Sequence, residues 1–222
     1  MSKVLVLAVH PDDETLGCGG TLLKHKAGGD EIFWLIATSI KEDNGLSKED
    51  ISHRAAEIKT VVNRYNFDGV YNLGIPTTKV DKFSISELIK MISKVFDEVE
   101  PNILYLPFIG DIHSDHRIIV EAAHSCTKTF RYPFIKKVMM METISETEFA
   151  LSLKGFTFVP NHFVDISDFI DEKLDIMKTY KDEISRHPFP RSLENIKALS
   201  VFRGATAGCK YAESFMVLKE IW

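Results

Sequence analysis

A run of apolar residues near the start of the chain ends abruptly in a cluster of charged side chains. Residues 3–9 read Lys-Val-Leu-Val-Leu-Ala-Val, which is typical of a strand buried on both faces. The strand is followed at once by His10-Pro11-Asp12-Asp13-Glu14. Strands buried on both faces belong to parallel sheets covered by helices, and ligands bind at the carboxyl ends of such strands. This junction therefore predicts an α/β fold with a binding site directly after its first strand.

Strand and helix signals then alternate along the chain. Apolar runs predict strands, and apolar residues at helical spacing predict helices. The predicted strands cover residues 3–9, 31–38, 70–73, 102–107, 137–142, 157–165 and 215–218, and the predicted helices cover residues 15–28, 47–65, 84–99, 116–129, 167–184 and 192–203. Repeated βα units predict a mainly parallel sheet with right-handed crossovers. Because no linker interrupts the pattern, residues 1–222 are expected to form one domain.

The composition narrows the class of protein. Apolar residues make up 45% of the 222 residues, and the net charge is −5, which argues against a nonspecific nucleic-acid binder because such proteins are basic. Three widely spaced cysteines form no CxxC pair, as expected in a reducing compartment. The sequence shows neither a signal-peptide pattern nor an apolar run of membrane-spanning length. We therefore expect a cytoplasmic protein with no integral membrane segment.

The first motif has the residue types of a metal site. Imidazole and carboxylate groups suit a divalent ion of the zinc type. His10 and Asp13 can face one point, and His116, from a second motif after residues 102–107, completes a set of three ligands. Three protein ligands with a position left open for water are the arrangement of catalytic zinc sites. Asp12 is then available as a base that takes a proton from the water.

The second motif, His113-Ser114-Asp115-His116, adds an acid and a base beside the same site. His113 can face the cavity together with His116, and Asp115 is expected to bond to His113 and hold it as a cation. Such a cation would stabilise an oxyanion or protonate a leaving amine, which amounts to metal-assisted amide hydrolysis. The alternative is that the acids serve only the helix dipole and that Asp115 is only a helix cap. That alternative does not explain His10 or the two histidines of the second motif.

At these residues the chain resembles the LmbE-like, or PIG-L, family of zinc-dependent N-deacetylases. Both motifs match, as do Gly17-Cys18-Gly19-Gly20, Arg54-Ala55-Ala56-Glu57 and Tyr211-Ala212-Glu213-Ser214-Phe215. The resemblance implies a Rossmann-like, three-layer αβα domain that removes acetyl groups from N-acetylglucosamine-containing small molecules or glycoconjugates. It also implies a homo-oligomer, either a trimer or a hexamer.

By the matching positions, the resemblance implies that His10, Asp13 and His116 bind Zn²⁺, or alternatively Fe²⁺. It makes Asp12 the general base and His113 the acid or oxyanion stabiliser, oriented by Asp115. Asp111 stands where some members carry a tyrosine, which removes the expectation of a tyrosine role here.

The residues outside the motifs leave alternatives open. Arg54 is either a substrate contact or a surface partner of Glu57 or Asp50, and Arg203 and Glu213 are expected to form a structural pair. A metallohydrolase for a non-sugar amide would share the metal chemistry and differ only in loops 39–46, 75–83 and 185–191. A non-catalytic metal-binding domain is a further alternative, but it would have no need of Asp12 and His113.

Overall fold

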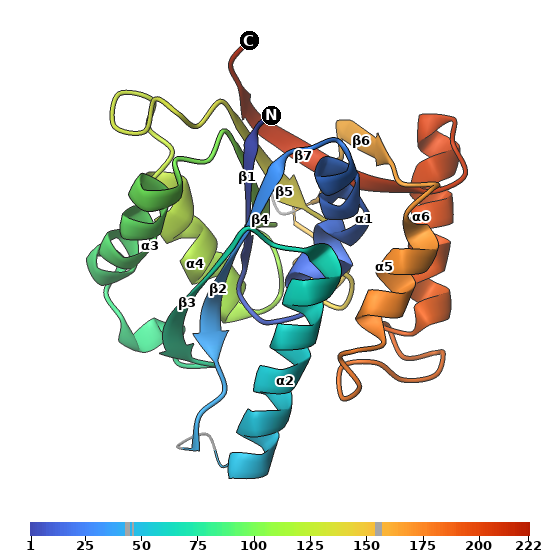
Figure 1. Ribbon diagram of the computed structural model, residues 1–222, viewed down its shortest axis with the longest axis horizontal. Helices are drawn as coiled ribbons and strands as arrows, with labels where there is room; N and C mark the ends of the chain where they lie inside the picture. Colours follow the sequence, from blue (N-terminus) through green and yellow to red (C-terminus); the bar gives the residue numbers. More distant parts are fainter. Residues whose placement is uncertain (43–44, 46, 154–156) are drawn as a thin grey trace.

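A seven-stranded sheet forms the middle layer of the computed structural model (Figure 1). The structure describes residues 1–42, 45, 47–153 and 157–222, so residues 43, 44 and 46 of the predicted loop 39–46 lie outside the described residues. The strands are β1 (Lys3–Ala8), β2 (Glu31–Ser39), β3 (Gly69–Pro76), β4 (Ile103–Pro107), β5 (Lys137–Met141), β6 (His162–Asp165) and β7 (Ala212–Glu220). The helices are α1 (Asp13–Ala27), α2 (Lys48–Tyr65), the short 3₁₀ helix η2 (Val80–Lys82), α3 (Ile85–Val99), α4 (Ser114–Ser125), α5 (Ile170–Met177) and α6 (Leu193–Ala207).

The strands lie in the order β3-β2-β1-β4-β5-β7-β6. The first five of these are parallel, whereas β7 runs antiparallel to both β5 and β6. This confirms the predicted mainly parallel sheet. The chain leaves β1 toward β2 and β3 on one side and later returns to place β4 and β5 on the other. In α/β proteins a crevice opens at such a switch point, beyond the carboxyl ends of the two strands, and here those strands carry the two motifs.

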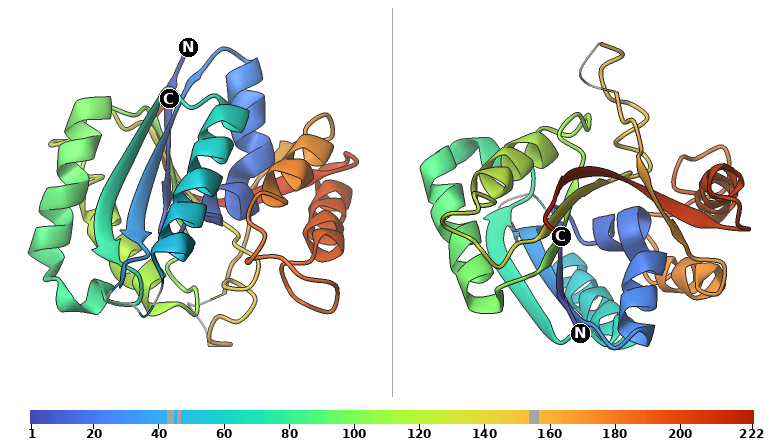
Figure 2. Two further views of the ribbon diagram at one scale, coloured as in Figure 1. Left: turned by 60° about the horizontal axis from the view of Figure 1, so that its bottom comes forward. Right: turned by 90° about the horizontal axis from the view of Figure 1, so that it is seen from above.

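Helices cover both faces of the sheet, which gives the expected three-layer Rossmann-like arrangement. Helices α3 and α4 lie on one face, and α1, α2, α5 and α6 lie on the other (Figures 1 and 2). A hydrophobic core lies on each face of the sheet, and β1 contributes to both. Leu5 and Leu7 pack on the face covered by α3 and α4, and Val4 and Val6 pack on the opposite face. Among the described residues, no helix has the length and apolar character needed to span a bilayer.

Two predicted elements are shorter than the sequence indicated. The predicted strand 157–165 is reduced to β6, because Pro160 has no backbone N–H to give to the sheet. The predicted helix 167–184 is reduced to α5, and Phe169 rather than Ser167 is its N-cap residue. After α5 the chain tightens into turns, with the Tyr180 N–H bonded to the Met177 carbonyl. These turns carry residues 178–192 toward the carboxyl end of β1.

Helix α1 is kinked at Cys18, whose backbone dihedral angles are not helical. The kink frees backbone groups that an unbroken helix would pair internally. The buried Glu213 carboxylate accepts hydrogen bonds from Gly20 N and Thr21 N at 2.9 and 2.7 Å. Lys173, which is 3% exposed, donates to the Leu16 carbonyl at 3.0 Å and to Glu213 at 2.7 Å. The two side chains therefore satisfy both sides of the kink.

The expected pairing of Arg203 with Glu213 is wrong. Arg203 instead binds Glu142 through two hydrogen bonds of 2.9 and 2.6 Å, while Glu213 is taken by Lys173. The absence of a side chain at Gly17 lets α1 pack closely against β5, because a Cβ on Gly17 would lie 2.5 Å from the sulfur of Met141.

Candidate metal centre

Three donor atoms from the two motifs converge beyond the ends of β1 and β4. His116 Nε2 lies 3.4 Å from His10 Nδ1 and 3.4 Å from Asp13 Oδ2. The three residues form one of the groups in the described part of the chain that can hold a metal ion. Donors bonded at about 2.0–2.1 Å in a tetrahedral zinc site lie about 3.3–3.4 Å apart. The two separations from His116 therefore suit a small divalent cation.

Backbone and side-chain partners hold two of these donors in place. Asp13 Oδ2 accepts hydrogen bonds of 2.9 Å from Val9 N and His10 N, at the end of β1. The other ring nitrogen of His116, Nδ1, bonds to Asp111 Oδ2 at 2.9 Å. Such a carboxylate partner fixes the tautomer of a ligand histidine and directs the Nε2 lone pair to the metal.

The electrostatics of the site favour positive charge. Burial by itself lowers the pKa of His116, but Asp13 and the hydrogen bond to Asp111 outweigh that effect and raise this pKa to about 9. The ring is fully buried, and burial normally drives the proton off an imidazole. The negative charge of Asp13 and Asp111 thus stabilises a proton on the buried His116 ring. The same negative charge would stabilise a metal cation bound beside that ring.

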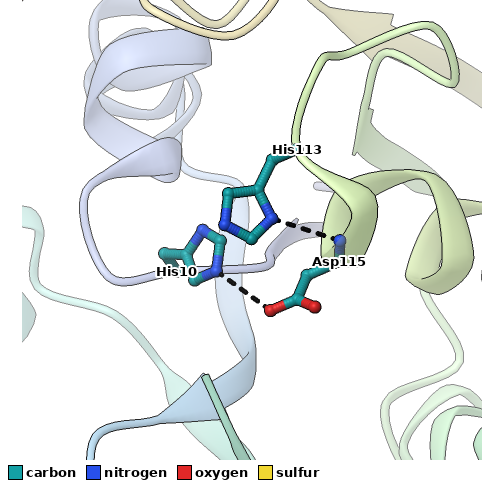
Figure 3. A group of neighbouring side chains, drawn as sticks. All are labelled: His10, His113 and Asp115. Atoms are coloured by element: carbon teal, nitrogen blue, oxygen red, sulfur yellow. Dashed lines mark hydrogen bonds and ion pairs between the residues drawn. The ribbon is translucent and has the colours of Figure 1, made fainter. Parts of the chain in front are cut away.

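Asp115 has a different contact from the one that the sequence suggested. In the described part of the chain its carboxylate forms no hydrogen bond with His113; Asp115 Oδ2 lies 3.5 Å from His10 Nε2 and accepts a 2.7 Å hydrogen bond from Thr78 N (Figure 3). Asp115 therefore faces a candidate ligand, as Asp111 does for His116. It also ties the loop after β3 to the metal centre.

His113 is the N-cap residue of α4, and its Nδ1 accepts the backbone N–H of Asp115 at 3.1 Å. Burial, and then the charge of His10, lower the pKa of His113 to about 4. The expected cationic form is therefore disfavoured in this structure. A neutral ring whose Nδ1 accepts must carry its proton on Nε2, so His113 is a hydrogen-bond donor through that atom.

Asp12 is held in a backbone conformation that costs energy. Its φ of 136° is rare for any residue other than glycine. The buried Glu14 carboxylate accepts the Asp12 N–H at 3.0 Å and the Tyr180 hydroxyl at 2.8 Å, which stabilises this turn. Burial, and then the charge of Asp13, raise the pKa of the Asp12 carboxyl well above its usual range. Glu14 thus supports the turn at Asp12.

A cavity of about 290 Å³ opens over the metal centre. The predicted residues His10, Asp12, Asp13, Arg54 and His113 line it. The other described lining residues come from α1 and from the loops around the cavity: Leu16 on the helix, and Pro11, Ile40, Thr77, Thr143, Ser145, Glu146, Glu183 and Arg191 on the loops. The Thr143 hydroxyl is buried without a hydrogen-bond partner in the described structure, so it is free to bond a ligand.

Residues 5–127, more than half of the chain, match the family model PIG-L, described as GlcNAc-PI de-N-acetylase. The chain belongs to the PIG-L family. The diacetylchitobiose deacetylase of Thermococcus kodakarensis is 25% identical over 240 residues, which cover 100% of this chain and 85% of that protein.

Solved structures with the PIG-L arrangement superpose over nearly the whole chain. The conserved protein TT1542 from Thermus thermophilus gives a TM-score of 0.79 at 25% identity, covering 100% of this chain and 97% of that one. The N,N'-diacetylchitobiose deacetylase of Pyrococcus horikoshii, solved with an inhibitor, gives 0.77 at 20% identity, covering 98% and 84%. The expected family and Rossmann-like fold are confirmed.

Several residues of this PIG-L site were not predicted from the sequence. Glu146 lines the cavity, and its carboxylate accepts a 3.2 Å hydrogen bond from the backbone N–H of His113. It follows β5, the strand beside β4, so the rule that ligands bind at carboxyl ends could have marked it. Arg191 ends loop 185–191, which the sequence marked only as a segment where substrate preference could differ, and Glu183 fell at the end of the predicted helix 167–184; nothing in the sequence singled out either side chain.

Proposed function

We propose that this protein is a metal-dependent N-deacetylase that hydrolyses the acetamide of an N-acetylglucosamine-containing small molecule and releases acetate. One observation carries the proposal. His10, Asp13 and His116 converge at donor separations that suit a cation, while a second buried carboxylate, Asp12, lines the same cavity outside that donor set. A site that only bound metal would have no need of this extra acid.

Asp12 is the proposed general base. A bound divalent cation supplies a water of lowered pKa and polarises the amide oxygen. The Asp12 carboxylate would take up the proton of the attacking water and return it to the amide nitrogen as the C–N bond breaks, so that acetate and the free amine leave. Burial raises the pKa of the Asp12 carboxyl above its usual range, which makes it a stronger base than an exposed aspartate. The hydrogen bond from Asp12 N to Glu14 keeps the carboxylate aimed while the proton moves.

His113 is the proposed oxyanion stabiliser. Its Nε2–H can donate to the oxygen that becomes negative when the amide carbon turns tetrahedral. The neutral ring favours this role over proton donation from an imidazolium. Asp115, which the family resemblance made the orienting residue of His113, is proposed instead to position His10.

Two histidines and one aspartate suit Zn²⁺, and Fe²⁺ is the alternative ion for the same set. The three cysteines are free, as expected in a reducing compartment, which supports a cytoplasmic location. Assembly into a trimer or hexamer is part of the same proposal, and light scattering of the purified protein would test it.

Acetate release from a panel of N-acetylglucosaminides tests the function. The metal-loaded protein is compared with a chelated sample and with the isosteric variant Asp12→Asn. We expect release that the chelator abolishes and that Asp12→Asn reduces by about a thousandfold or more, since the base is lost while the metal stays bound. Release only from non-sugar acetamides would redirect the proposal to another amide. Stoichiometric metal without release from any amide would support a non-catalytic binding domain.

A further inference from the structure

Two arginines lie in the wall of the cavity, and each is already engaged by carboxylates. Arg54 on α2 forms an ion pair with Glu57, with 3.3 Å between Nη1 and Oε2, and a second one with Glu183. Glu57 is almost fully buried, so this pair is not the loose surface contact that the sequence allowed as an alternative. Asp50, the other partner considered, is bonded to Ser47 at the helix cap.

Arg191 reaches the same carboxylate from the segment after α5. Its Nη2 lies 3.1 Å from Glu183 Oε2, and its Nη1 lies 3.4 Å from Asp12 Oδ2. Glu183 therefore bridges the two guanidinium groups and joins α2 to the segment that carries Arg191.

Carboxylates outnumber guanidinium groups on this wall of the cavity. Two guanidinium groups face the three carboxylates of Asp12, Glu57 and Glu183. Among the described lining residues, Arg54 and Arg191 are the only lysines or arginines, and Glu146 adds a further acid to the cavity. An anionic group entering here would compete with Asp12, Glu57 and Glu183 for the two arginines and would meet their negative charge. Breaking a partly buried pair of this kind leaves a charge without compensation.

We propose that the site selects uncharged saccharides and that Glu183 is the residue that sets this specificity. This inference rests on the proposed deacetylase function and names its substrate class: N-acetylglucosaminides whose aglycone carries no phosphate or carboxylate. Arginine binds carboxylates and phosphates through the N–H groups at the edge of its guanidinium group. Glu183 contacts these N–H groups on both arginines, where an anionic substrate would otherwise bind.

The test uses two glycosides that differ only in charge, the 2-hydroxyethyl and the carboxymethyl β-glycosides of N-acetylglucosamine. Turnover of both is measured by acetate release. Binding of the two deacetylated products, which cannot react further, is measured by calorimetry on the same metal-loaded protein. The variant is Glu183→Gln, which keeps the side-chain shape and removes the charge. The matched control is Glu172→Gln, which weakens the exposed pair between Glu172 and Arg64 on the outside of α2.

For the wild type we expect the uncharged product to bind more tightly and the uncharged glycoside to have the lower KM. In Glu183→Gln the preference should shift toward the carboxylated compounds by roughly ten- to a hundredfold, the usual value of a charge-assisted hydrogen bond. The shift should appear in the dissociation constant and KM, with Glu172→Gln matching the wild type.

Tighter binding of the carboxylated product by the wild type would overturn the inference. So would an equal change for both products in Glu183→Gln. Because product binding does not depend on turnover, a protein that discriminates the products as expected but releases no acetate would contradict the proposed function and leave the specificity inference supported.

Discussion

The buried pair between Lys173 and Glu213 offers a sharp test of how the kinked helix α1 is held. Lys173→Met removes the ammonium group while keeping an unbranched side chain of similar length. It leaves the Glu213 carboxylate buried with only its two backbone donors, and it leaves the Leu16 carbonyl without its partner. Removing one member of a buried ion pair costs about 3–5 kcal/mol.

The cost should fall when both charges are removed. Glu213→Gln alone leaves a buried ammonium, whereas the double variant leaves neither charge. We therefore expect a coupling of at least about 2 kcal/mol between the two substitutions in a double-mutant cycle. Urea unfolding followed by circular dichroism gives the free energies of unfolding.

Lys178→Met serves as the matched control, because Lys178 pairs with Asp175 at 3.2 Å on an exposed surface. Exposed pairs contribute about 0–1 kcal/mol. Because the first turn of α1 carries Asp13, Lys173→Met should also weaken metal binding. A loss below about 1 kcal/mol for Lys173→Met, or strict additivity in the cycle, would refute the idea that this pair stabilises the kink.

Other perturbations address the metal centre directly. His116→Ala should abolish stoichiometric metal binding, while His113→Ala should keep the metal and lower kcat by about 10²–10³-fold, the usual loss for one oxyanion donor; metal analysis and acetate release on both variants would reveal exchanged roles. Asp111→Asn should weaken metal affinity about ten- to a hundredfold, as seen when the carboxylate partner of a ligand histidine is lost, and an unchanged affinity by competition with a chromophoric chelator would contradict that role. Zn²⁺ at about a thousand times its dissociation constant should stabilise the folded protein by about 4 kcal/mol; an unfolding temperature that a chelator leaves unchanged would count against a resident ion.

The sequence predicted the side chains that directly follow a strand or begin the next helix. His10 and Asp13 follow β1 directly, and His116 lies in the first turn of α4, so strand and helix signals were enough to bring them together. The strands were predicted well for the same reason, because a strand buried on both faces is written in consecutive apolar residues. Ser47 and Ser84 cap their helices as expected.

The partner of an individual charged side chain could not be predicted in this way. Glu213 was expected to pair with Arg203, and only the packing of α5 against α1 shows that Lys173 is its partner. Asp115 lies close to His113 in the sequence, yet its carboxylate turns toward His10, which belongs to the first motif. Both outcomes depend on which elements lie side by side, and charge patterns along the chain carry no such information.

The centre and the walls of the cavity come from different parts of the chain. The candidate metal ligands belong to the segments after β1 and β4, whereas Arg54, Glu146, Glu183 and Arg191 come from α2, the segment after β5 and the segment after α5. Evolution or an engineer could therefore exchange the wall segments to accept a new aglycone while the ligands stay in place. Because Glu183 and Arg191 lie in one short stretch of irregular chain, a graft confined to residues 183–191 would be the first such exchange to attempt, since it leaves Tyr180 in place beside Glu14 and loops tolerate changes better than the elements they connect.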